Sequence, residues 1–231
     1  MSAPLPSPAD RSGGFQPPTR RLEAAATETW MYLLRHGATE NNVAQPPRLQ
    51  GRRADLPLSA AGQIQAGQAA ELLRSRPIAA IYSSPLKRAW QTAEQIAALL
   101  NLPIHVLEAI TEIDVGQWEG RDWGEIERSE PEAFRRFIDD PGTWPYAGGE
   151  SMGQVQQRVV PALDGLLVQH AGQSIVVVSH NVVNRCYVAH LMGLPLQRAR
   201  SISQENCGIN VIRRRGETAS LIALNAAFHL G

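Results

Sequence analysis

The chain has 231 residues, of which 43% are hydrophobic, so it can bury one substantial core and we expect a single folded domain. Its 22 basic and 22 acidic residues balance, which excludes the global electrostatic field that would hold nucleic acid, an anionic membrane or an acidic partner. Cys186 and Cys207 are too few for a disulfide framework, so we expect buried free thiols and a reducing compartment.

Residues 1–29 are rich in proline, serine and glycine. Such a segment cannot bury enough apolar surface to offset its chain entropy, so we predict a mobile tail over 1–29 and a folded domain over 30–231. The tail lacks the pattern of a secretory signal, and its acidic residues weigh against the organellar transit peptide that its arginines would fit. No later stretch approaches the roughly 18 apolar residues of a membrane span, so we expect a cytoplasmic protein with no membrane partner.

The first strand is predicted over 30–34, where an apolar run ends abruptly in Arg35 and His36. A helix is predicted over 58–74, with Ser59 as its N-cap. Together these segments predict a first βα unit. The apolar residues of the helix recur at near-helical spacing, and they are Ile64, Ala69, Leu72 and Leu73.

A second βα unit begins with an apolar strand over 78–82. Ser84 precedes Pro85, an order typical of a capping hydroxyl followed by proline at the first helical position. We therefore predict a helix from Pro85 to about Leu100. Another strand is predicted over 104–107.

Residues 111–149 are rich in glycine, tryptophan, proline and charge, which predicts an excursion over the sheet edge with short helices near 123–127 and 131–138. A capping box at Ser151 and Gln154 then begins an amphipathic helix that returns to the sheet. The tryptophans of the excursion either wall a substrate pocket or pack the excursion itself, and they are Trp118, Trp123 and Trp144.

A β-branched run over 175–178 predicts a central strand that is covered on both faces and delivers His180 just beyond its end. A helix over 182–192 follows, and then a terminal hairpin built from 209–213 and 220–224. Strands that alternate with helices predict an α/β fold, a three-layer sandwich with a mostly parallel central sheet.

Parallel sheets place their sites beyond the carboxyl ends of the strands. Arg35, His36 and His180 follow predicted strands, and Arg88 lies in the first turn of a helix that follows another. Two imidazoles and two guanidiniums are therefore expected at one point of a chain without net charge. This concentration of cations predicts an anionic ligand, and paired guanidinium donors fit phosphate oxygens.

The segment from Arg35 to Asn41 resembles the R-H-G-x-T-x-x-N pattern of the histidine phosphatase superfamily, also called the phosphoglycerate-mutase-like family. Further segments resemble later blocks of that family in the same order: 49–51, 57–62, 83–93, 112–120 and 178–180. The resemblance extends from about residue 31 to the C-terminus. It implies the sandwich fold and a phosphoric monoester hydrolase of the histidine acid phosphatase type.

The resemblance implies that His36 is the nucleophile and becomes phosphorylated, while Arg35, Arg88 and the amide of Asn41 hold the phosphate. A free histidine with a pKa of about 6.5 is mostly neutral at neutral pH, and adjacent guanidiniums favour that form further. His180 is expected to donate to the phosphate, as a neutral or a protonated ring. The two histidines then serve opposite roles.

The leaving alkoxide needs a proton, which a carboxyl group of raised pKa usually supplies. The resemblance implies that this acid is Glu112, with Asp114 and Glu119 as nearby alternatives.

Substrate contacts are expected from Gln50 and Gly51 of the second block and from Asn181. The family often has glycine after the second histidine, where this chain has Asn181, and Asn184 or Arg185 are further candidates to reach the substrate. The leaving group therefore stays open among a sugar phosphate, a nucleotide precursor, phosphoserine and a cofactor intermediate.

The sequence contains no P-loop and no clustered metal-ligand motif, so we expect no cofactor and no metal. The expected partner is a small phosphomonoester, with no nucleic acid, and a homodimer is a family-level expectation. Hydrolysis is favoured because residues 112–120 resemble the phosphatase branch that includes alpha-ribazole phosphatase and the broad-specificity phosphatases. The alternatives are a cofactor-dependent phosphotransferase of the phosphoglycerate mutase type and a non-catalytic phosphate-binding protein on the same fold.

Overall fold

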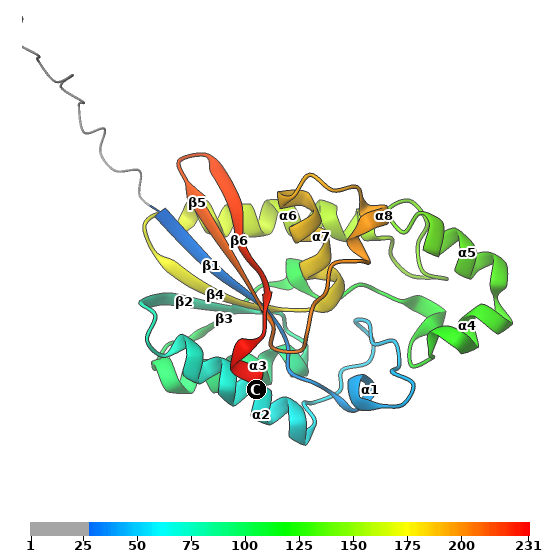
Figure 1. Ribbon diagram of the computed structural model, residues 1–231, viewed down its shortest axis with the longest axis horizontal. Helices are drawn as coiled ribbons and strands as arrows, with labels where there is room; N and C mark the ends of the chain where they lie inside the picture. The colour runs from blue at the N-terminus through cyan, green and yellow to red at the C-terminus, as the bar shows by residue number, and fades with distance from the viewer. Residues whose placement is uncertain (1–27) are drawn as a thin grey trace, which may run out of the picture.

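One six-stranded sheet runs through the centre of the protein (Figure 1). The computed structural model describes residues 28–231, so the predicted tail lies outside the described residues except for its last two. β3, β2, β4 and β1 are parallel neighbours, and β5 and β6 continue the sheet antiparallel beyond β1, which confirms a mostly parallel sheet. In that order the strands span Ile104–Val106, Ile78–Ser83, Ser174–Ser179, Glu28–Arg35, Ile209–Arg215 and Thr218–Ala226.

The first strand is longer than its apolar run. β1 begins at Glu28, where Glu28 and Thr29 pair with Arg215 and Arg214 of β5. The Glu28 carboxylate also forms an ion pair with Arg215. The strand predicted over 30–34 therefore started two residues too late, because the antiparallel ladder with β5 extends the strand past its apolar segment.

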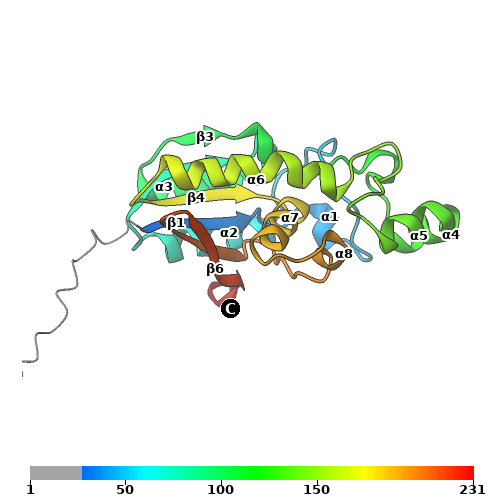
Figure 2. The same cartoon turned by 90° about the horizontal axis from the view of Figure 1, so that it is seen from above.

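Helices cover both faces of the sheet (Figure 2). α2 and α3 pack together on one face, and α6 and α7 pack together on the other. Within the described residues the α-helices are α1 Glu40–Val43, α2 Ala60–Leu73, α3 Lys87–Leu100, α4 Trp123–Ser129, α5 Pro131–Asp139, α6 Met152–Gln169, α7 Asn181–Leu191 and α8 Leu196–Ala199. No helix in this part of the chain is both long enough and apolar enough to cross a bilayer.

The central strand β4 shows why the sheet needs cover on both sides. Ile175 and Val177 belong to the apolar cluster under α6 and α7, whereas Val176 and Val178 belong to the cluster under α2 and α3. Successive residues of a strand point to opposite faces, and none of these four side chains is exposed to solvent. The three-layer sandwich is thereby confirmed.

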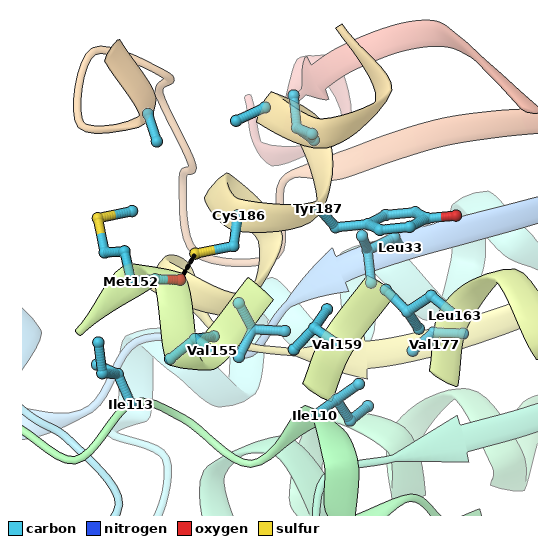
Figure 3. Close-up of a cluster of buried hydrophobic side chains, with 14 of the residues drawn as sticks. Leu33, Ile110, Ile113, Met152, Val155, Val159, Leu163, Val177, Cys186 and Tyr187 are labelled. Atoms are coloured by element: carbon cyan, nitrogen blue, oxygen red, sulfur yellow. Dashed lines mark hydrogen bonds between the residues drawn. The ribbon is translucent and has the colours of Figure 1, made fainter. Parts of the chain in front are cut away.

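Figure 3 shows the apolar cluster between the sheet and α6. Leu33 and Val177 from neighbouring strands meet Val159 and Leu163 of α6 and the ring of Tyr187 of α7. The Tyr187 hydroxyl donates to Asp164 Oδ1 at 2.8 Å, which satisfies its only polar atom. Both cysteines are free and buried, as predicted.

The N-terminal caps of two long helices agree with their sequence patterns. Ser59 Oγ accepts from the amide of Gly62 at the start of α2. Ser151 and Gln154 form the reciprocal capping box at the start of α6. These hydrogen bonds satisfy amides that have no partner within the helix, and they fix where each helix begins.

α3 begins later than its sequence pattern predicts. Its first residue is Lys87 and its N-cap is Leu86, so Pro85 does not occupy the first helical position. Ser84 bonds instead to His180, with 2.7 Å between Ser84 Oγ and Nε2 of the imidazole. The Ser84 side chain therefore contacts the histidine that follows the neighbouring strand β4.

The apolar spacing of α2 was partly misleading. Ile64 and Leu72 are 65% and 42% exposed. The buried face is made instead by small residues and one leucine, namely Gly62, Ala66, Ala69, Ala70 and Leu73. Small side chains allow α2 to approach α3 closely, and the larger side chains of Ile64 and Leu72 lie outside this contact.

Two neighbouring leucines of α2 provide a test of this face. Leu73→Ala should lower the free energy of unfolding by about 2–5 kcal/mol, because Leu73 is 1% exposed and its loss leaves a cavity. Leu72→Ala should cost less than about 1 kcal/mol, because much of that side chain already contacts water. Urea denaturation of both variants measures the difference, and equal losses would contradict the assigned face.

Candidate active site

The carboxyl ends of β1, β2 and β4 bring the predicted residues together, as Figure 1 shows for the strands that point toward α1 and α7. His36 follows β1 and His180 follows β4, and these strands are direct neighbours. The two imidazole centroids lie 5.2 Å apart. Both rings are buried, so the predicted convergence of the two histidines is confirmed.

The His36 ring is held by one contact at each nitrogen. Nδ1 lies 2.7 Å from the carbonyl oxygen of Gly37, and Arg88 Nε donates to Nε2 at 3.2 Å. A carbonyl only accepts and a guanidinium only donates, so the two contacts together assign the proton to Nδ1 and the lone pair to Nε2. Burial first, and then Arg88 and Arg35, hold the pKa of His36 well below its usual 6.5. The ring is therefore neutral at physiological pH.

Arg88 is fully buried in the first turn of α3. Its Nη1 donates to the carbonyl of Ala54 and its Nη2 to the carbonyl of Gly51, both at 2.9 Å. Together with the bond to His36, these contacts fix the plane of the guanidinium. A buried cation held by neutral carbonyls keeps its positive charge available to an anion.

Arg35 supplies the second guanidinium. Its Nη1 donates to the carbonyl of Gln204 at 2.7 Å, and its Nε is buried without a partner among the described residues. Burial lowers its pKa to about 10, against the opposing effect of Glu112. Arg35 therefore remains a cation at neutral pH and retains an unused donor.

His180 is bonded at one nitrogen only. Its Nε2 lies 2.7 Å from Ser84 Oγ, while Nδ1 is buried and has no partner in the described part of the chain. Burial, then Arg88 and His36, hold its pKa well below 6.5, so the ring is neutral here. If the serine hydroxyl donates to Nε2, the proton lies on Nδ1, which becomes a donor in need of an acceptor.

Glu112 lies in the loop that follows β3, and only 3% of it is exposed. Its Oε1 accepts from the amide of Ile113 at 3.0 Å and its Oε2 from the amide of Val182 at 3.3 Å. Burial raises the pKa of Glu112 and outweighs the lowering by these amides and by Arg88. A buried carboxyl of raised pKa is suited to donate a proton.

The two alternative acids are engaged elsewhere. Burial raises the pKa of Asp114, but the hydrogen bonds from Arg53 and Gly116 lower it by more, so the net shift is downward. Its carboxylate pairs with Arg53 at 2.9 Å. Glu119 Oε1 accepts from the amide of Gly51 at 2.6 Å, and neither acid lines the cavity in front of His36.

A cavity of about 320 Å³ opens in front of these groups. Arg88 and His180 contact His36 but do not line this cavity. Of the predicted residues, it is lined by Arg35, His36, Gln50, Glu112 and Asn181. The Oδ1 of Asn181 is buried without a partner in the described residues, which is consistent with a substrate contact.

A family model described as the histidine phosphatase superfamily (branch 1) matches residues 31–227. The chain belongs to the histidine phosphatase superfamily. Phosphoserine phosphatase 1 of Hydrogenobacter thermophilus is 36% identical over 87% of this chain and 94% of its own length. A probable phosphoglycerate mutase, GpmB of Proteus mirabilis, is 36% identical over 78% of this chain and 82% of its own length.

A solved structure gives the same result for the fold. The phosphoserine phosphatase of Entamoeba histolytica in complex with 3-phosphoglyceric acid superposes with a TM-score of 0.79. It is 28% identical, and the match covers 88% of this chain and all of that one. The superfamily and its phosphoserine phosphatase members support phosphatase activity for this histidine phosphatase.

Two predicted phosphate or substrate contacts need correction. Counting along the R-H-G-x-T-x-x-N pattern places its asparagine at Asn42, and the structure lines the cavity with Asn42 and not with Asn41. On the single turn of α1 only one of two adjacent residues faces the cavity. Asn42 Oδ1 also accepts from Thr39, which holds the amide in place.

Gly51 contacts Arg88 and is not among the cavity residues. Its carbonyl accepts from Arg88 and its amide donates to Glu119, so both of its backbone polar groups are used within the protein. A Cβ at this position would lie 2.6 Å from the carbonyl oxygen of Ile113. Glycine is therefore required because the chain passes too close to another backbone.

The structure separates the tryptophans that the sequence left undecided. Trp118 is fully buried, and its ring meets Trp123, Phe137 and Tyr146 edge to face at 6.2, 5.7 and 5.6 Å. Trp144 is 45% exposed. Trp123 alone of the three lines the cavity, because it lies at the first turn of α4 where the excursion faces the site.

Some cavity residues were missed or left open by the sequence analysis. Arg185 lines the cavity, whereas Asn184 is buried and bonds to Gln204, which decides between those two candidates. Tyr146 and Arg48 also line it and carried no motif. Within residues 28–231, no group of three or more histidine, cysteine or acidic side chains is arranged to hold a metal ion.

Gly51 allows a direct test of how Arg88 is positioned. Gly51→Ala should lower kcat/KM for phosphomonoester hydrolysis by at least about tenfold, because the new methyl group displaces the carbonyl that holds Arg88. Gly67→Ala on α2 is the matched control, since nothing lies within 4 Å of its added methyl group. The control should keep full activity, and a Gly51→Ala enzyme of normal activity would show that Arg88 needs no such support.

Proposed function

We propose that the protein is a phosphoric monoester hydrolase that transfers the phosphoryl group of a small phosphomonoester to His36 and then to water. Glu112 is the proton donor in this proposal. One observation carries it: a neutral imidazole with its lone pair on Nε2 lies among two guanidiniums, and a buried carboxyl of raised pKa lines the same cavity.

In the first step, the phosphate dianion is held by Arg35, Arg88 and the Nδ1 proton of His180. His36 Nε2 attacks phosphorus, and the bond between phosphorus and the ester oxygen breaks. Arg88 Nε must then turn from Nε2 to a phosphate oxygen, because the lone pair it contacts is the one that attacks. The leaving alkoxide takes the proton of Glu112 and departs as the alcohol.

In the second step, the Glu112 carboxylate accepts a proton from a water molecule that attacks phosphorus from the cavity. The bond between Nε2 and phosphorus breaks, and inorganic phosphate leaves with His36 again neutral. Glu112 has regained its proton, so the site returns to its starting state. The two guanidiniums neutralise the charge that spreads over the phosphoryl oxygens in both steps.

The competing candidate is transfer to a second substrate, as in a mutase, since one relative carries that name. Hydrolysis is preferred because the phosphoserine phosphatase relative is matched over a larger share of both chains. A panel of phosphorylated metabolites tests the choice through release of inorganic phosphate. Conversion of 3-phosphoglycerate to 2-phosphoglycerate with negligible phosphate release would overturn hydrolysis, and inactivity on every substrate would favour a binding protein.

His36→Ala should abolish both turnover and labelling. Wild-type protein mixed with a 32P-labelled substrate and quenched rapidly should carry acid-labile, alkali-stable label, as a phosphohistidine does. His105→Ala is the control, because His105 is an exposed ring on β3 away from the cavity. Label that persists in the His36→Ala protein would place the covalent intermediate on another residue.

Glu112→Gln should lower kcat for alkyl phosphates by about 10²–10⁴-fold, because the alkoxide loses its proton donor. The loss should be much smaller for p-nitrophenyl phosphate, whose leaving group needs little protonation. Glu108→Gln, at an exposed position four residues earlier, should leave both rates unchanged. Equal losses on the two types of substrate would remove Glu112 from the role of acid.

The pH profile of kcat/KM should be bell-shaped. The pKa of Glu112 lies above its usual 4.5, so the proton is retained at higher pH and activity falls as pH rises through the raised pKa. The pKa of His36 lies well below 6.5, so activity falls on the acid side only as pH drops through that lowered value. In Glu112→Gln the alkaline limb should disappear, and an unchanged limb would assign it to another group.

A further inference from the structure

A second cavity, of about 560 Å³, adjoins the one in front of His36. The two cavities share Trp123, Tyr146, Val182 and Arg185 as lining residues. The second cavity lies between α7, α8 and the excursion, on the side away from Arg35 and His36, which do not line it. A leaving group that extends from the phosphate site into the second cavity therefore passes Arg185.

Among residues 28–231, the second cavity is lined by cations and by no carboxylate. Its charged lining residues are Arg185, Arg198 and Arg200. Arg198 is exposed, whereas Arg185 and Arg200 are half-buried. Since the chain as a whole has no net charge, three guanidiniums on one wall are a local excess.

Arg185 stands at the boundary of the two cavities. It lies four residues after Asn181 on α7, so both side chains emerge from the same face of the helix. Its Nε donates to the carbonyl of Ile202 at 2.8 Å, which anchors the head group. No carboxylate of the described residues lies within 4.0 Å of its guanidinium.

Arg200 adds a second fixed charge nearby. Its guanidinium lies over the rings of Trp123 and Phe137, at 5.0 and 5.6 Å from their centroids. Burial first, and Arg200 in addition, lower the pKa of Arg185 against the opposing effects of Tyr146 and Glu112. Two half-buried guanidiniums that repel each other are stabilised when an anion lies between or beside them.

We infer that Arg185 marks an anion subsite for the leaving group, so that the preferred substrates are phosphomonoesters whose alcohol carries a second negative group. A carboxylate and a second phosphate share the chemistry that a guanidinium recognises with paired donors. The inference rests on the proposed hydrolysis at His36. It adds the substrate class that the phosphate site alone leaves open.

Two matched substrate pairs test the subsite in the wild-type protein. 3-Phosphoglycerate is compared with glycerol 3-phosphate, which differs by the carboxylate, and fructose 1,6-bisphosphate with fructose 6-phosphate, which differs by a phosphate. The expected result is a preference in kcat/KM of about 10- to 100-fold for the doubly anionic member of at least one pair, as for a charge-assisted contact. The pair that shows the preference identifies the anion.

Arg185→Gln should reduce that preference by about 10- to 100-fold, and Arg185→Lys should restore only part of it, because an ammonium lacks the planar fork. Arg74→Gln is the control, because Arg74 is an exposed arginine at the end of α2 and should keep the wild-type ratio. A wild-type ratio near one in both pairs, or an unchanged ratio in Arg185→Gln, would overturn the subsite while leaving hydrolysis at His36 intact. If no phosphomonoester is hydrolysed at all, the proposed function fails together with the subsite.

Discussion

The hydrogen bond from Arg88 Nε to His36 Nε2 is the contact on which the rest of the site depends. Together with burial, Arg88 keeps His36 neutral, and the bond holds the lone pair in one direction with a buried cation beside it. Arg88 can do this only because carbonyls of Gly51 and Ala54 occupy its other donors. Two carbonyls of the loop between α1 and α2 therefore hold this guanidinium.

The sheet topology supplies the other half of the arrangement. β1 and β4 are parallel neighbours at the centre of the sheet, so the residues after their ends lie side by side. β4 is buried on both faces, which makes its end a rigid support for His180. α7 begins directly after His180, and its first turns carry Asn181 and Arg185 toward the cavity and the amide of Val182 toward Glu112. One short helix thus connects the residues around His36, the Glu112 carboxyl and the second cavity.

The excursion between β3 and α6 forms part of the wall of the cavity in front of His36. Its aromatic cluster is centred on Trp118, which packs the excursion and leaves Trp123 and Tyr146 at the cavity. Trp118, Phe137 and Tyr146 belong to the same apolar cluster as residues of β1 and β4, so the excursion is packed onto the main core of the protein. Cations also lie at two parts of the fold: Arg35 lines the first cavity at the end of the sheet, and Arg185, Arg198 and Arg200 of α7 and its neighbour α8 line the second.

The sequence by itself determined the features that depend on neighbours along the chain. The β-branched run of β4 and the caps at Ser59 and Ser151 involve residues within a few positions of one another, so their patterns predicted them correctly. The two histidines and Arg88 were also predicted, because strand ends in a parallel sheet converge. Only the tertiary structure decided that Ile64 and Leu72 face solvent, that Gly51 supports Arg88, and that Arg185 has no acidic partner within the described residues. Those properties depend on burial and on contacts between distant segments, such as Glu112 with Val182, and a linear pattern does not record them.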